Sequence, residues 1–424
     1  MSILISFIFI AGYIAIAFEQ QLKVNKAASA LITAVLCWTV YILQSNNVHI
    51  VSEELLQASG EIAAILFFLL GAMTIVELID AHNGFDVIRE KIHTKSTGKL
   101  LVIIAIITFF LSSLLDNLTT AIVMISLCAK LLNDKQDRLW FAGIIVITAN
   151  LGGAWSPLGD VTTTMLWIGG QVTAWNIIVT LILPCLLAGI IPVWIVSKKL
   201  KGKFFQSPPA TDISAAEKRE GKLILLTGLG FLIFVPLFKS ITHLPPFMGM
   251  LLALGLMWII TAIIHRDKKG DYKEQFSVAR ALQKIDTPSI LFFLGILLAV
   301  AALQSCGILG KIAVAMNHTF ENHYIIGAIL GLFSAVVDNV PLVAAAQGMY
   351  DIGTYPTDHS FWEFLAFTTG SGGSAIIIGS AAGVAVMGIE QIDFMWYLKK
   401  ISWLALLAFV IGIAVFFLQQ LIFL

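Results

Sequence analysis

Residues 148–160 read Thr-Ala-Asn-Leu-Gly-Gly-Ala-Trp-Ser-Pro-Leu-Gly-Asp, and this stretch decides how the chain folds. Its glycines and its proline fall too close together for a continuous helix. The flanking residues are apolar, so we expect a membrane span over 139–168 that is broken in the middle. Unwound backbone at membrane depth survives where it is buried in protein or lines a polar cavity, where its carbonyl oxygens can serve as ligands. The alternative is that the glycines only allow close helix packing.

The broken stretch has a second copy about 220 residues further along the chain. Residues 369–374 read Thr-Gly-Ser-Gly-Gly-Ser and lead to Gly379-Ser380, which predicts a second broken span over 362–389. Other pieces repeat in the same order: Ile-Leu-Phe-Phe-Leu at 65–69 and 290–294, and Asp-Asn at 116–117 and 338–339. Five spans separate the two copies, and an odd number turns the second copy upside down. We therefore predict inverted repeats, which are typical of secondary transporters.

Composition sets the class of protein around these repeats. Hydrophobic residues make up 58% of the 424 residues and charged residues only 12%, whereas about 25% is usual in soluble proteins. This excludes a soluble enzyme, a nucleic-acid binder and a disulfide scaffold, and it predicts an all-α polytopic membrane protein. The four cysteines are expected to be small buried apolar residues. The ten expected spans are 3–18, 27–43, 62–79, 139–168, 175–196, 223–240, 246–264, 289–305, 362–389 and 400–422.

Two further apolar stretches, 100–132 and 324–350, are interrupted by the Asp-Asn pairs. Each arm of the first has about 15 residues and is about 22 Å long as a helix, which is short of the ~30 Å hydrocarbon core. We therefore predict two re-entrant helical hairpins, one in each repeat.

The distribution of Lys and Arg gives the orientation. With these spans, 24 of the 26 basic residues fall on one face of the membrane, and only Lys239 and Lys311 fall on the other. The basic face is cytoplasmic, so both termini are expected outside the inner (plasma) membrane.

Three carboxylates lie in apolar surroundings: Asp116, Asp160 and Asp338. An ionised Asp at bilayer depth costs about 2.5–3.5 kcal/mol, so these residues are expected to have a function. The alternative for Asp116 and Asp338 is helix capping, which Ser or Asn could provide without the charge. Hard oxygen ligands suit a small hard cation. The neutral ligands expected to join the carboxylates are Asn117, Thr119, Asn150, Thr162, Asn339, Ser371, Ser374 and Ser380.

The eight histidines are expected at span ends or in loops, as surface residues and not as ligands. Among them, His82 is the best candidate for a pH-responsive group at the cytoplasmic mouth, because Glu77 and Asp80 lie beside it in the sequence.

The Asp-Asn hairpins, the unwound Gly-Gly…Ser-Pro-x-Gly-Asp helix and the repetition of both resemble the ion transporter superfamily. Within it, segments 74–82 and 148–164 look like NhaD-type sodium/proton antiporters, and the resemblance covers nearly the whole chain from about residue 60. Dicarboxylate carriers of the superfamily carry Ser-Asn-Thr at both hairpin tips, where this chain has Asp-Asn-Leu-Thr and Asp-Asn-Val-Pro. This departure favours a cation as the substrate. The resemblance implies a homodimer in which a transport unit slides against a scaffold.

The sequence thus predicts a Na⁺(Li⁺)/H⁺ antiporter without a cofactor, in which cation and proton compete for buried carboxylates. Asp116, Asn117 and Asp160 are expected to hold the sodium ion. The alternative is a sodium-coupled dicarboxylate carrier of the same fold. The expected organisation is an N-terminal scaffold (1–98), the first half of the transport unit (99–196), a cytoplasmic linker (197–222), further scaffold spans with the start of the second repeat (223–322), and the second half of the transport unit (323–424).

Overall fold

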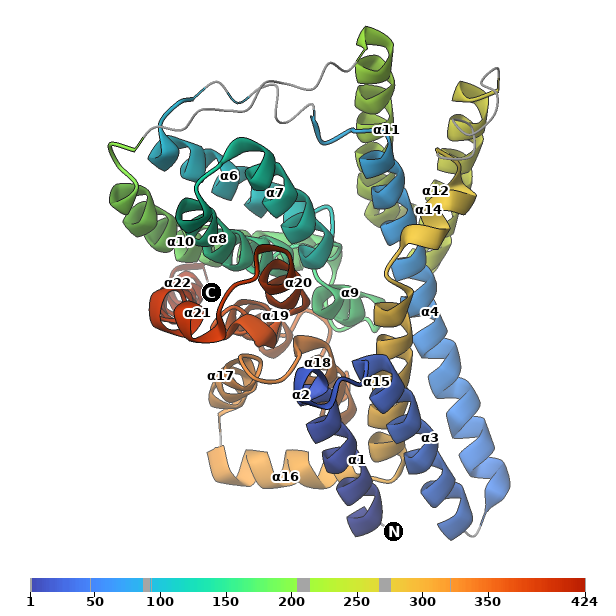
Figure 1. The fold of residues 1–424 in the computed structure, drawn as a ribbon. Coiled ribbons are helices and arrows are strands. Elements are labelled where there is room, and N and C mark those ends of the chain that lie inside the picture. The colour runs from blue at the N-terminus through green and yellow to red at the C-terminus, as the bar shows by residue number, and fades with distance from the viewer. Residues whose placement is uncertain are drawn as a thin grey trace.

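The structure, a computed structural model, describes residues 2–45, 47–86, 92, 94–203, 214–266, 276–320 and 322–423. Every regular element within these ranges is a helix (Figure 1). The middle of the expected linker, 204–213, lies outside the described residues, and the helices on either side of it end at Lys199 and begin at Ala215.

The first half of the chain begins with four helices that precede those of the expected transport unit. They are α1 (Ser2–Ala17), α2 (Glu19–Leu22), α3 (Lys26–Gln44) and the long α4 (Val48–Ala81). The helices of the expected transport unit follow: α6 (Thr97–Ser112), α7 (Asn117–Leu131), α8 (Lys135–Ala154), α9 (Val161–Ile168) and α10 (Ala174–Lys199).

The second half of the chain contains the remaining helices. Its outer helices are α11 (Ala215–Thr242), α12 (Pro246–Ile264), α14 (Val278–Lys284), α15 (Thr287–Ser305) and α16 (Ile308–Phe320). The remaining helices are α17 (His323–Phe333), α18 (Asn339–Met349), α19 (Ser360–Gly372), the short 3₁₀ helix η1 (Ile377–Gly379), α20 (Ala381–Glu390), α21 (Phe394–Lys400) and α22 (Ser402–Phe423).

The chain is an all-α, multi-pass membrane protein. In the part of the chain that the structure describes, seven helices are long and apolar enough to cross a bilayer: α3, α4, α10, α11, α12, α15 and α22. They match seven of the ten expected spans. Of the other three, α1 is a shorter apolar helix of 16 residues. The remaining two are interrupted, as α8 with α9 and as α19 with η1 and α20.

The outer helices exchange partners between the two halves of the chain. Helix α4 packs against α11 and α12 of the second half, and α15 packs against α1 and α3 of the first half. Figure 1 shows α4 rising through the molecule from its N-terminal end, whereas α15 descends. Each half therefore contributes helices that support the other.

The same backbone contacts recur at the two breaks. The Ser112 hydroxyl donates to the carbonyl of Ala149, and in the second half the Ser334 hydroxyl donates to the carbonyl of Thr369. A Cβ at Gly152 would overlap the carbonyl oxygen of Phe109, and a Cβ at Gly372 would overlap that of Gly331. Close approach of helix backbones thus requires glycine here, so the packing explanation holds for these two residues.

Candidate functional site

Four helices follow breaks in the chain, and a short polar side chain caps each one. Asp116 caps α7, Asp160 caps α9, Asp338 caps α18 and Ser380 caps α20. The first residues of the two hairpin arms, Asn117 and Asn339, are also buried. Capping is therefore a real role of the three aspartates, and it brings their carboxylates to helix N-termini, where negative charge is favoured.

Asp160 lies at the junction of the two halves and is only 1% exposed. Its Oδ2 accepts a hydrogen bond from the Asn117 side-chain amide at 2.5 Å and another from that of Asn339 at 3.2 Å. Its Oδ1 accepts from the backbone N–H and the hydroxyl of Thr162, at 2.9 and 2.8 Å. Donors from both hairpin tips and from its own half-helix thus converge on one buried carboxylate.

Asn150 extends this network into the second half. Its Oδ1 accepts from the Asn117 amide at 3.0 Å. Its own amide donates to the hydroxyls of Ser374 and Ser380, at 2.8 and 2.9 Å. Asn150 is fully buried, so the six side chains form one continuous polar cluster inside an apolar protein. We call this cluster the central network; its members are Asn117, Asn150, Asp160, Asn339, Ser374 and Ser380.

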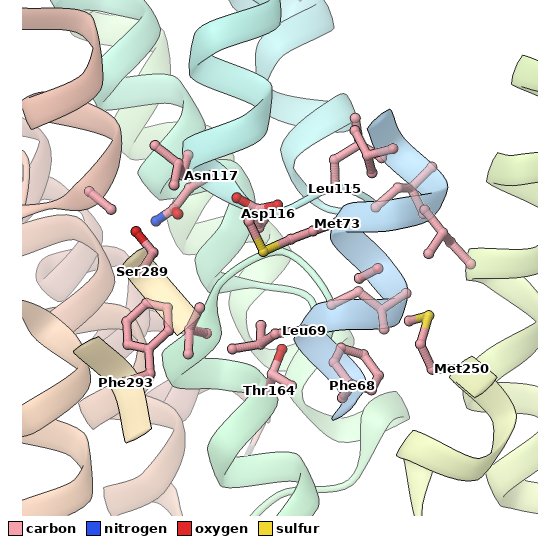
Figure 2. A pocket seen from close by; sticks show the side chains of 18 residues that line it. Phe68, Leu69, Met73, Leu115, Asp116, Asn117, Thr164, Met250, Ser289 and Phe293 are labelled. Atoms are coloured by element: carbon pink, nitrogen blue, oxygen red, sulfur yellow. The ribbon is translucent and has the colours of Figure 1, made fainter. Parts of the chain in front are cut away.

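Asp116 lies beside the central network but faces a different space. Both of its carboxylate oxygens accept from Thr119, from the backbone N–H at 2.8 Å and from the hydroxyl at 2.6 Å. Figure 2 shows Asp116 next to Met73 of α4, above a cavity that Phe293 of α15 also lines. The cavity has a volume of about 40 Å³, enough for water or a small ion. Asp116 is thus placed at the boundary between the transport unit and the outer helices.

Asp338 occupies the equivalent boundary in the second half, but a lysine accompanies it. Lys26 Nζ lies 4.0 Å from Asp338 Oδ2 and 4.5 Å from the centre of the Phe292 ring. A pocket of about 390 Å³ lies here, lined by Tyr13, Glu19, Lys26 and Asp338 and reaching Ser380 of the central network. The two halves therefore differ in charge, because Asp338 has a tethered counter-ion.

Side-chain hydroxyls donate hydrogen bonds to backbone carbonyls of the unwound stretch at residues 155–160. Thr163 donates to the carbonyl of Ser156 at 2.7 Å, and Thr164 donates to that of Pro157 at 2.8 Å. The Ser156 hydroxyl donates to the carbonyl of Ser113 at 2.5 Å. These carbonyls therefore help to hold the loop in shape, and the expectation that backbone carbonyls also serve as ligands stays a prediction. The Ser371 hydroxyl donates to the carbonyl of Phe367 in its own helix and does not join the residues around Asp160.

The three residues expected to respond to pH are not brought together. Glu77 pairs with Lys284 at 3.2 Å, and Asp80 lines a pocket of about 160 Å³ with Lys130. His82 is buried and lies next to His265 and Glu220. The expectation of surface histidines is thus wrong for His82 and His265, because α11 and α12 pack over the end of α4.

Sequence reasoning missed several residues that shape the site. Lys26 was counted only as an orientation signal. Thr163 and Thr164 had a local signal, since they follow Thr162 in a run of three threonines. No local sequence signal pointed to Tyr397, which is fully buried and whose hydroxyl donates to the carbonyl of Ser374 at 2.9 Å.

Comparisons with known proteins agree with this architecture. Residues 13–370 match the family described as citrate transporter. Sodium/proton antiporter 1 of Arabidopsis thaliana is 46% identical over 96% of this chain and 70% of that protein. Sodium/proton antiporter 2 of the same plant is 45% identical over 95% of this chain and 96% of that protein. The Na⁺/H⁺ antiporter NhaD of Alkalimonas amylolytica is 31% identical over 90% of this chain and 83% of that protein.

Proposed function

Because the chain belongs to the citrate transporter family and, within it, to the NhaD-type sodium/proton antiporters, we propose that it exports Na⁺ or Li⁺ in exchange for H⁺. The proposal assigns no enzymatic activity and no cofactor to the chain. The transported ions are the ligands, and the physiological consequence is control of internal sodium and pH.

The observation that carries the proposal is the position of Asp160. A buried carboxylate is stable as an anion only when donors or a cation compensate its charge. Here the donors are two asparagine amides and Thr162. The two amides can turn and the Thr162 hydroxyl can rotate, so each of these side chains can present an oxygen to the site in place of a hydrogen. The backbone N–H of Thr162 cannot.

This gives a physical route for competition. With Asp160 ionised and alone, Asn117 and Asn339 turn their NH₂ groups toward it. When Na⁺ binds, the same amides turn their Oδ1 atoms inward and supply hard oxygen ligands. When a proton binds, the new O–H finds one of these oxygens as its acceptor. Sodium and proton therefore occupy the same charge site in turn and do not occupy it together.

Asp116 is proposed as the second ion-carrying carboxylate. It is adjacent to Asn117, which contacts Asp160 directly, and it lines the cavity at the outer helices. An ion arriving through that cavity meets Asp116 first and passes to Asp160 through Asn117. In this scheme Asp116, Asn117 and Asp160 share the sodium ion, and Asn339 adds an amide oxygen from the second half. Thr119, Thr162, Asn150, Ser374 and Ser380 hold these groups in place. Asp338 completes the pseudo-symmetric half.

The architecture proposed for this function is an inverted repeat. Helices α6–α10 and α17–α22 form the transport unit, with re-entrant hairpins α6–α7 and α17–α18. Helices α1–α4 and α11–α15 form the scaffold. The recurring contacts at the two breaks and the opposite directions of α4 and α15 support this division. We further propose an inner (plasma) membrane location with both termini outside, and a homodimer in contact with lipid through the scaffold.

A dicarboxylate carrier is the second candidate, because four helix N-termini meet at the centre and such ends attract anions. The Asp160 carboxylate already occupies this position, and it would repel a carboxylate substrate. The antiporter therefore fits the site better.

A dye assay for the pH gradient in inverted membrane vesicles tests the proposal. Vesicles that contain the protein are acidified by respiration, and NaCl, LiCl, KCl and citrate are added in turn. Antiport predicts that Na⁺ and Li⁺ collapse the gradient, whereas K⁺ and citrate do not. Sodium-dependent uptake of radiolabelled citrate, with no effect of Na⁺ on the gradient, would establish the carrier instead.

A further inference from the structure

A second polar cluster lies away from the central network, where three outer helices end or begin. His82 caps the C-terminal end of α4 and His265 caps that of α12. Glu220 lies near the start of α11. The two histidines are 4% and 2% exposed, and the Glu220 side chain is 14% exposed. Three elements therefore bring two imidazoles and one carboxylate together in a largely dry place.

The ligand-type atoms of this cluster converge on one point. His265 Nε2 lies 2.5 Å from Glu220 Oε1, and His82 Nε2 lies 3.8 Å from the same oxygen. The three ligand atoms all lie within 4.8 Å of one another. The imidazole rings are stacked, with centroids 5.1 Å apart and an interplanar angle of 17°. Both Nε2 atoms thus face the carboxylate side by side.

The backbone sets the tautomer of His82. Its Nδ1 lies 2.6 Å from the carbonyl oxygen of Leu78, one turn earlier in α4. A carbonyl only accepts, so Nδ1 carries the hydrogen, and the lone pair is on Nε2, which faces Glu220. This is the arrangement of metal-binding histidines, in which the other ring nitrogen donates to a backbone carbonyl or a carboxylate.

The cluster also has an apolar wall. Phe276 packs against both rings, with centroid distances of 4.9 Å to His82 and 5.6 Å to His265. An apolar wall limits water, and it lets a ligand set hold an ion more tightly than an exposed set can.

We propose that His82, Glu220 and His265 form a binding site for a transition-metal dication of the zinc class. Two imidazole nitrogens and one carboxylate oxygen suit Zn²⁺ and its neighbours Co²⁺ and Ni²⁺, whereas Na⁺, Mg²⁺ and Ca²⁺ prefer oxygen-only sites. A water molecule takes the fourth position. Binding requires His82 to move closer by about 1 Å, so that all three atoms come within about 2.0–2.2 Å of the ion.

The protonation balance of binding is simple. In the metal-free protein His265 donates its Nε2–H to Glu220. The ion takes the place of that hydrogen, which moves to Nδ1 of the same ring when the imidazole is neutral and leaves to solvent when the imidazole is charged, so metal and proton compete at low pH. Metal affinity should therefore increase with pH.

The metal ties together α4, α11 and α12, which pack against one another as outer helices. It does not involve Asp160 or Asp116. The site is thus independent of the exchange reaction, and its test does not depend on transport.

The test is metal binding by the purified full-length protein in detergent after removal of bound metal with a chelator. Titration with Zn²⁺ by calorimetry should give one ion per chain, and titration with Co²⁺ should give the intense visible absorption of four-coordinate cobalt. His82→Gln, His265→Gln and Glu220→Gln should each weaken Zn²⁺ binding by at least about tenfold, because each removes one of three ligands. The matched control is His243→Gln, since His243 is an exposed cap of α11 and its loss should leave binding unchanged.

A measurement on the unaltered chain covers the case in which a variant fails to fold. X-ray absorption at the zinc edge of the protein loaded with one equivalent of Zn²⁺ should show a four-coordinate nitrogen and oxygen shell with the scattering pattern of two imidazoles. The proposal is overturned if the absorption spectrum shows no imidazole ligand, if the cobalt spectrum is that of a six-coordinate ion, or if folded His82→Gln and His265→Gln proteins bind Zn²⁺ as the wild type does.

Discussion

Asp160 is held by donors from residues that are far apart in the chain, and this defines its role at the scale of the residue. Asn117 reaches it from the first hairpin and Asn339 from the second. A carboxylate that only capped α9 would need Thr162 alone. The two additional amides come one from each half of the chain, so both halves hold the Asp160 carboxylate. In the proposed scheme, a change in either half therefore alters how well the site holds a cation.

Replacing Asp160 with Asn separates charge from capping. Asn caps a helix about as well as Asp, so the folded protein should remain. Sodium-driven collapse of the pH gradient should fall to the background of empty vesicles, because the proposed scheme needs the Asp160 carboxylate to exchange a proton for sodium. Asp116→Asn should have the same effect. The matched control is Asp393→Asn, because Asp393 caps α21 at an exposed position with a bond to Trp396 of 2.8 Å. Full exchange by Asp160→Asn at normal expression would show that the residue only caps.

The pair of Lys26 and Asp338 leads to a prediction of its own. If Lys26 is the fixed counter-ion of Asp338, Asp338→Asn leaves an unpaired cation in the pocket that reaches Ser380. Its charge should raise the Na⁺ concentration for half-maximal exchange by about tenfold, which corresponds to about 1.4 kcal/mol. The double variant Lys26→Met with Asp338→Asn removes both charges and should recover most of the loss. A double variant no better than Asp338→Asn would mean that the two side chains act independently.

Sequence reasoning found the carboxylates and amides because charge in apolar surroundings is conspicuous. It could not find that Lys26 faces Asp338, because the two residues come together through the packing of α3 against α15 and of α15 against α18. Nor could it distinguish Ser374, which bonds Asn150, from Ser371, which bonds its own helix. Ser371 lies in the last turn of α19, whereas Ser374 lies beyond the end of that helix at Gly372, so the position where the helix ends decides the difference.

At the scale of the element, the broken helices depend on close backbone contacts. The Gly-Gly pairs let α8 approach α6 and let α19 approach α17, and the serine hydroxyls of Ser112 and Ser334 then join the paired backbones. The breaks were predictable, because glycine and proline interrupt a helix whatever surrounds them. The way in which Thr163 and Thr164 satisfy the freed carbonyls was not, since it requires the path of the loop.

Gly152→Ala and Gly372→Ala test these contacts. Each added methyl group would overlap a carbonyl oxygen of the neighbouring helix, and overpacking of this kind costs about 1–3 kcal/mol. Both variants should lower the thermal unfolding temperature in detergent and reduce exchange. Gly189→Ala is the control, because the nearest atom to its added carbon would be Leu151 Cδ1 at 3.6 Å. Equal unfolding temperatures for all three variants would contradict the role of the glycines.

At the scale of the whole molecule, the two halves support each other through exchanged outer helices. Seven of the ten expected spans followed from sequence patterns, and the inverted repeat stays a prediction. The pairing of α4 with α11 and α12, and of α15 with α1 and α3, could not be derived, because apolar helices of similar composition can pack in many ways. The same limitation explains why His82 and His265 were expected at the surface, although the packing of α4, α11 and α12 buries both side chains.

Topology provides the test at this scale. Two exposed positions, Lys201 and Pro356, lie in connections between helices and suit labelling. In a background with Cys306→Ser, Lys201→Cys should react with an impermeant maleimide only from the cytoplasmic side. Pro356→Cys should react only from outside. Reaction of both from one face would contradict the expected topology on which the inverted repeat rests, since three of the expected spans, an odd number, separate these two positions.

The most direct test of the central claim is whether binding of sodium displaces a proton from Asp160. Purified protein in weakly buffered detergent solution, near the pH where exchange is fastest, is mixed with NaCl, and the released protons are measured with a pH-sensitive dye. Choline chloride serves as the control for ionic strength. We predict saturable proton release with Na⁺ and Li⁺, none with choline, and none with Na⁺ in Asp160→Asn. Binding of Na⁺ without proton release, or release that persists in Asp160→Asn, would contradict the account.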